Sequence, residues 1–229
     1  MAKNPLAKTI RQMRMHVLSD LHGDLPMWWR LRLWEEMEEQ LQGESSLRRS
    51  CLALHVCAEI LLDWEQAQMP TKYAALPRTA FEIARHFLLG ILSRPVVEAV
   101  CSEYIATHED CMGVCDWEEK GDAVFAYHAS RFILFRVLAL DDKLYKQHDL
   151  YHDSWLDDES VRPTEKHLAD DVFWDTHFIA SANAAKGAYW EPDRCDDELR
   201  RRFWIRWLDE TLPQFVGDLQ VAKVKALLL

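Results

Sequence analysis

The sequence predicts an all-α fold, a single-domain multi-helix bundle around a buried central helix at about residues 121–140. Three observations support this prediction. Residues 121–140 are apolar around nearly the whole helical circumference, which is typical of a helix that is buried on all sides. Prolines separate most of the other segments that show helical periodicity. No segment shows the apolar–polar alternation of a half-buried strand.

The predicted central helix reads GDAVFAYHASRFILFRVLAL. Its polar side chains between the two flanking aspartates are His128, Ser130, Arg131 and Arg136. The run is nearly long enough to span a bilayer, but two arginines in its interior argue against that environment. We therefore expect this helix to form the centre of a soluble helical domain, with other helices packed around it.

Prolines mark the limits of most of the other predicted helices. Proline fits the first turn of a helix but disrupts its interior, so Pro26, Pro77, Pro95 and Pro163 are expected to begin helices and Pro70 to end one. The predicted helices cover about residues 25–43, 47–68, 77–92, 95–108, 163–189 and 195–212. In the third of these, the periodicity places Ile91 on the buried face.

The last predicted helix carries both aromatic and arginine-rich positions. Its first turn contains Asp196, Asp197 and Glu198, which complement the positive end of the helix dipole. We expect Phe203, Trp204 and Trp207 to lie in the core. The three arginines expected to lie mostly on the opposite side are Arg200, Arg201 and Arg206.

The length and composition of the chain fit either one large domain or two small ones. A chain of 229 residues with 49% hydrophobic content can bury a large core, and the sequence shows no linker or repeat. We expect a single all-helical domain over residues 1–229, in which residues 1–22 could form a flexible or partly ordered N-terminal arm. That N-terminal stretch is basic but lacks the apolar segment of a signal peptide. We therefore expect a cytoplasmic protein whose cysteines stay reduced and pack as small hydrophobes.

The net charge limits the choice of partners. A formal charge of -11 disfavours nucleic acid and anionic membranes, because their phosphates would be repelled. It favours a basic protein as partner. We expect a monomer, although an oligomer is possible.

One short motif resembles a metal-binding block. The sequence HVLSDLHGD, residues 16–24, is similar to the first block of calcineurin-like metallophosphoesterases, in which Asp20 and His22 would be metal ligands. The further blocks of that family are absent, since neither Asn4 nor Asn183 precedes a histidine. The alternating strand–helix order that would hold the site is absent as well, so we do not assign this activity.

Two other pairs have metal-ligand spacing but lack the remaining ligands. His148 and His152 lie four residues apart, and Cys111 and Cys115 have the same spacing, yet neither pair has an assignable third ligand. No Gly-x-Ser-x-Gly nucleophile motif is present. We therefore expect no catalytic residue, no metal and no cofactor. A metal-dependent hydrolase is the least favoured alternative.

The segment from Asp141 to Glu159 is the predicted partner-binding surface. It interleaves carboxylates, which steer a basic partner, with Tyr and Trp, which supply interface hot spots. The predicted contact residues are Asp141, Asp142, Asp149, Tyr151, Asp153, Trp155, Asp157, Asp158 and Glu159. The alternative interpretation is an exposed loop whose aromatic side chains cover the core.

Three stretches together resemble one family. They are HGDLPMWWRLRLWEEM, LLDWEQAQMPTKYAALPRTAFEIARHFLLG and RRRFWIRWLDETLPQF. Their pattern is similar to that of the all-helical immunity proteins encoded beside bacterial polymorphic toxins. The resemblance extends from about Gly23 to Phe215, with no match between about residues 96 and 171. It implies a non-catalytic protein that binds and silences a cognate, cytosol-acting toxin. A helical scaffold or oligomeric interaction protein is the main alternative.

Overall fold

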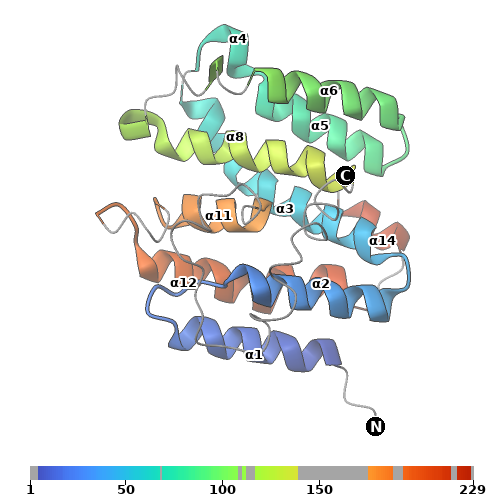
Figure 1. Cartoon of the computed structure of the whole chain (residues 1–229), viewed down its shortest axis with the longest axis vertical. Coiled ribbons are helices and arrows are strands. Elements are labelled where there is room, and N and C mark those ends of the chain that lie inside the picture. Colours follow the sequence, from blue (N-terminus) through green and yellow to red (C-terminus); the bar gives the residue numbers. More distant parts are fainter. Residues whose placement is uncertain are drawn as a thin grey trace.

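The computed structural model describes residues 5–67, 69–107, 110–111, 117–138, 175–187, 193–217 and 221–227, and these form layers of helices (Figure 1). Helices and their connections account for all of these residues, with no strand among them. The predicted all-α, single-domain fold is therefore confirmed.

Helix α1 (Pro5–Ser19) forms one outer layer of the molecule, next to α2 (Met27–Leu41) (Figure 1). Its buried side chains Leu6, Met13 and Val17 repeat at helical spacing and join the core. Most of the segment that could have formed an N-terminal arm is thus a helix packed on its neighbours. Thr9 donates a hydrogen bond of 2.6 Å to Glu36 of α2 and fixes the relative position of the two helices.

The central part of the chain contains α3 (Ser45–Gln66), α5 (Leu76–Leu88) and α6 (Arg94–Ala106). A short helix, α4 (Thr71–Ala74), joins α3 to α5 and was not predicted. The placement of Ile91 on a buried face was wrong, since its side chain is 65% exposed. Helix α5 ends at Leu88, and Gly90 at φ 78° turns the chain out of the helical path before Ile91.

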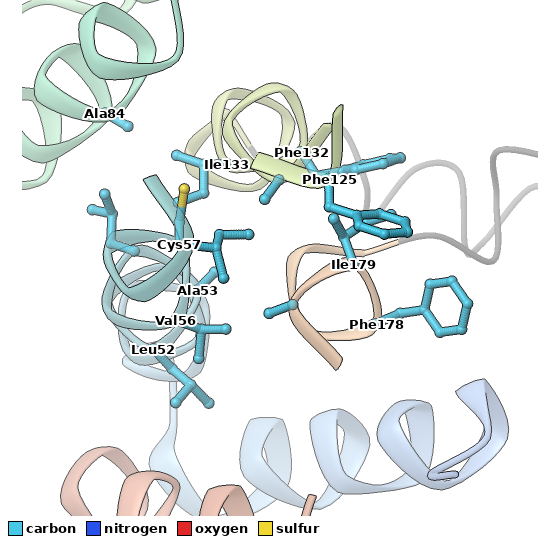
Figure 2. Close-up of a cluster of buried hydrophobic side chains, with 14 of the residues drawn as sticks. Leu52, Ala53, Val56, Cys57, Ala84, Phe125, Phe132, Ile133, Phe178 and Ile179 are labelled. Carbon is cyan, nitrogen blue, oxygen red and sulfur yellow. The ribbon is translucent and has the colours of Figure 1, made fainter. Parts of the chain in front are cut away.

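Helix α8 (Trp117–Val137) is the predicted central helix. From residue 123 to residue 138 every side chain is buried except Arg131 and Phe135, which are half-buried. It packs against α3, α5, α6 and the later helix α11 (Thr176–Ala184). In Figure 2, Phe132 and Ile133 of this helix lie in one apolar cluster with residues of α3 and α11. The prediction of a helix buried on all sides is confirmed.

No described helix, α8 included, combines the length and the apolarity that crossing a bilayer requires.

The C-terminal part contains α12 (Asp197–Arg206), a π-helical turn η3 (Trp207–Thr211), α13 (Pro213–Val216) and α14 (Val221–Ala226). Asp196 caps α12 by accepting hydrogen bonds of 3.0 Å from two backbone N–H groups. In η3, the Leu212 N–H donates to the Trp207 carbonyl oxygen at 2.7 Å. This wider turn precedes Pro213, which has no N–H to donate.

The predicted core residues of this helix are confirmed. Phe203, Trp204 and Trp207 are all buried. The prediction that Arg200 lies on the solvent side was wrong, because its side chain is only 1% exposed. Its guanidinium donates to the Gly187 carbonyl oxygen at 2.8 Å and to Cys195 Sγ at 2.7 Å. These acceptors compensate for the loss of water.

Gly23, in the turn after α1, has no room for a side chain. Its φ is +62°, and a Cβ there would lie 2.6 Å from Arg201 Cβ and 2.9 Å from the Asp197 carbonyl oxygen. Gly23→Ala is therefore expected to lower the free energy of unfolding by about 2–4 kcal/mol, through left-handed strain and overlap. Urea unfolding measures this.

The control for this prediction is Gly90→Ala. Gly90 has a similar φ of +78°, but nothing lies within 4 Å of the position that a Cβ would take there. This variant should therefore show the strain alone, about 1–2 kcal/mol. Equal losses in the two variants would contradict the overlap at Gly23.

Candidate partner-binding surface

The predicted contact residues from Asp141 to Glu159 all lie outside the described residues. Their assignment to a partner-binding surface therefore remains a prediction. His148, His152 and Cys115, which were weighed as metal ligands, also lie outside them.

A buried ionic cluster explains the arginine-bearing helix of the first family-like stretch. Arg30 of α2 is 1% exposed, and its Nε donates a hydrogen bond of 3.0 Å to Asp175 Oδ2. Its guanidinium carbon lies 5.4 Å from the centroid of the Trp204 ring and 5.8 Å from that of Phe178. Trp204 Nε1 in turn donates to Asp24 Oδ1 at 3.0 Å. The cluster therefore joins α2, α11 and α12.

Asp175 has two structural roles in this cluster. It is the N-cap of α11, where its Oδ1 accepts a hydrogen bond of 2.7 Å from the Phe178 N–H. Burial alone would raise the pKa of Asp175, but the charge of Arg30 and the hydrogen bond from Phe178 help to hold it below its ordinary value. The carboxylate is thus charged at neutral pH, as its pairing with Arg30 requires.

The motif that resembles a metallophosphoesterase block forms the turn between α1 and α2. Asp20 Oδ1 accepts hydrogen bonds from the backbone N–H groups of His22 and Asp24, at 2.9 and 3.2 Å. His22 Nδ1 lies 3.1 Å from Asp197 Oδ2 of α12. These side chains therefore shape a turn and attach it to α12. Within the described residues, no three His, Cys, Asp or Glu side chains are grouped so that they could hold a metal ion.

The cysteine thiols of the described residues are suited to packing. Cys51, Cys57 and Cys101 are buried free thiols, Cys111 is buried, and Cys195 is half-buried and free. Burial raises the pKa of Cys51 to about 12 and that of Cys195 to about 11. Both thiols are therefore protonated at neutral pH, and a protonated thiol is a poor nucleophile.

The described surface contains an acidic face that was not singled out in the sequence. Glu35, Glu38 and Glu39 of α2 are all exposed and follow i, i+3, i+4 spacing, so they share one side of the helix. We call these three residues the α2 acidic face. In the sequence, the repeated glutamates in WEEMEEQ indicate this face. That pattern alone does not distinguish a partner-binding face from an ordinary solvated one.

Comparison with known proteins identifies the family. The model of the family described as immunity protein Imm5 matches residues 10–214. The chain belongs to the Imm5 immunity protein family. The predicted resemblance to immunity proteins is therefore confirmed. No curated protein matches the chain.

The match covers more of the chain than the three stretches that predicted it. It begins within α1 and ends in α13, and so includes the Arg30 cluster and the turn at Gly23. The resemblance in sequence began only at Gly23, because α1 carries no proline, glycine or aromatic marker between its ends.

Proposed function

We propose that this Imm5 protein binds and neutralises a cognate toxin that acts in the cytoplasm, and that it does so without catalysis. Membership of an immunity protein family carries the proposal. The net charge of -11 supports a toxin with a basic surface, such as a substrate cleft that accepts nucleic acid or nucleotides.

In this proposal, the segment Asp141–Glu159 supplies the main contact surface. Its carboxylates attract the basic surface and increase the association rate, while Tyr151 and Trp155 act as anchors that slow dissociation. The combination is suited to an inhibitor, because a toxin that acts in the same compartment must be captured quickly and held.

The decisive experiment starts with the tagged protein in the cytosol of its own cell. Stoichiometric recovery of one basic protein, identified by mass spectrometry, would provide the toxin for direct measurements. The variant to compare is Asp157→Lys/Asp158→Lys/Glu159→Lys. We expect its affinity for that toxin to fall by at least about tenfold, because attraction becomes repulsion. Protection in co-expression should fall with it, and the melting temperature should not change.

A matched control separates a local effect from a change of total charge. Glu98, Glu103 and Asp110 are exposed on and near α6, and their change to lysine alters the net charge equally. This control should keep its affinity and its protection. A third variant changes the glutamates of the α2 acidic face to lysine. It tests whether the partner contacts that face instead of the segment Asp141–Glu159. Full protection by the Asp157–Glu159 variant would refute the assignment of the surface.

A further inference from the structure

Helix α1 has an exposed face that the proposed function leaves unexplained. Met15 is 60% exposed and Leu18 is 45% exposed, and Leu21, in the turn after the helix, is 75% exposed. Lys8 and Arg11 are exposed on the same side of α1, because the four helix positions follow i, i+3, i+7, i+10 spacing. The opposite side packs into the core, and α1 is an outer layer of the molecule (Figure 1). We call these five residues the α1 outer face.

The charge of the α1 outer face is opposite to that of the whole protein. The chain carries a formal charge of -11, whereas α1 contains Lys8, Arg11 and Arg14 and no acidic residue. Arg14 pairs with Asp209. The exposed Lys8 and Arg11 form no ion pair or side-chain hydrogen bond within the described residues. Grouped apolar side chains beside unpaired cations indicate a surface that a partner with apolar and acidic groups would cover.

An exposed carboxylate lies at the other end of this face, where α12 begins. Arg201 of α12 donates hydrogen bonds to the carbonyl oxygens of Asp20 and Leu21, at 2.9 and 3.4 Å. The same guanidinium donates to Glu198 Oε2 at 2.9 Å, and the Glu198 side chain is 55% exposed. The face therefore has cations near the start of α1, apolar side chains in the middle and a carboxylate near Leu21 at the other end.

We propose that the α1 outer face is the interface of a homodimer, in which α1 packs antiparallel against α1 of a second copy. Two-fold symmetry brings the same surface of both copies together, so a face with opposite charges at its two ends complements itself. Arg11 lies about 10 Å from Leu18 along the helix axis. An antiparallel pairing that buries Met15 and Leu18 therefore brings Arg11 of each copy towards Glu198 of the other. This proposal does not depend on the toxin.

The charges of the face favour a second copy over other partners. A toxin with a basic surface, as in the proposed function, would be repelled by Lys8 and Arg11. An anionic membrane would attract these two cations but would repel Glu198 and the chain as a whole, whose net charge is -11. A surface that carries both signs of charge complements the face at both of its ends.

The dimer is expected to be weak. Helix α1 has 15 residues and is about 22 Å long. The contact therefore buries on the order of 1,000 Å² in total, at the lower limit of specific interfaces. The like net charge of the two copies also opposes association. We therefore expect a Kd of about 10–100 µM.

Sedimentation velocity of the full chain at concentrations from about 5 to about 500 µM covers this range. We expect the sedimentation coefficient of the wild type to rise with concentration, from that of a monomer towards that of a dimer. Met15→Lys/Leu18→Lys should weaken the dimer by at least about tenfold, because it places like charges at the centre of the contact.

The matched control for this variant is Leu62→Lys/Ile105→Lys. It changes the net charge equally, at two apolar side chains of α3 and α6 that are 54% and 53% exposed, and the dimer should keep its affinity. A wild type that stays monomeric throughout would overturn the proposal, as would a dimer that Met15→Lys/Leu18→Lys does not weaken. A monomeric wild type that binds vesicles of anionic lipid would assign the face to a membrane instead.

An exchange of charges tests the antiparallel arrangement. Arg11→Glu should weaken the dimer by about tenfold, because it places a carboxylate near Glu198 of the other copy. Arg11→Glu/Glu198→Lys restores opposite charges at that contact and should recover most of the lost affinity. Arg11→Glu/Glu103→Lys restores the net charge equally, at an exposed residue of α6, and should recover much less. Equal affinities of the two double variants would refute the antiparallel pairing.

Discussion

Replacing Arg30 with methionine is expected to lower the free energy of unfolding by about 3–5 kcal/mol, because removing one partner of a buried ion pair leaves the other charge uncompensated. Arg30 is 1% exposed and Asp175 is 8% exposed, so bulk water has little access to the charge that remains. The variant also loses the contacts of the guanidinium with the rings of Phe178 and Trp204. Urea unfolding followed by tryptophan fluorescence measures the change.

A double variant identifies the cause of this loss. Arg30→Met/Asp175→Asn removes the stranded charge, while asparagine can still cap α11. It should therefore be more stable than Arg30→Met alone. The control is Arg202→Met on α12, where the side chain is 71% exposed and pairs with Glu198. That change should stay within about 0.5 kcal/mol of the wild type. A loss below about 1 kcal/mol for Arg30→Met would contradict the role of the ion pair.

The Arg30–Asp175 pair also shows what could not be predicted from the sequence. The two residues are 145 positions apart. Periodicity identifies the buried face of a helix but does not say which segment will cover it. The apolar pattern was enough to predict that α8 is buried, because a helix that is apolar all round must be buried whichever segments cover it. It could not predict Arg200, because a charged residue is counted as exposed unless its acceptors, here Gly187 and Cys195, are known.

For the candidate site, the sequence could predict which segment binds a partner but not how its side chains are arranged. The acidic and aromatic composition of Asp141–Glu159 favours a partner-binding role, but composition does not fix which side chains lie together. The same limit applies to the α2 acidic face. Its glutamates have the spacing of any solvated helix face, and their exposure follows only from the packing of α1 and α3 on the other sides. A functional surface therefore has to be chosen by a binding measurement.

The stability of the protein is expected to fall as the pH decreases from about 6.5 to about 4, and His177 contributes to this fall. Burial lowers the pKa of His177 from 6.5 to about 4. Arg30 of α2, Arg49 of α3 and Arg136 of α8 lower it further, while Asp175 opposes them. Between these two pKa values the unfolded chain binds a proton at this position and the folded chain does not. The free energy of unfolding therefore rises with pH across this window.

The size of the effect and its assignment can both be measured. A pKa difference of this size corresponds to about 3 kcal/mol, present above about pH 6.5 and lost by about pH 4. Asp175, whose pKa is lowered, contributes in a different pH window. Its contribution to stability is lost only below the ordinary range of an aspartate pKa, near pH 4.

Urea unfolding at a series of pH values from about 4.5 to about 7 should thus give a steeper dependence of the free energy of unfolding on pH for the wild type than for His177→Phe. Phenylalanine also removes the buried Nδ1 atom, which has no hydrogen-bond partner among the described residues. This variant should therefore equal or exceed the wild type in stability at the acidic end. Parallel curves would show that His177 is not the titrating group.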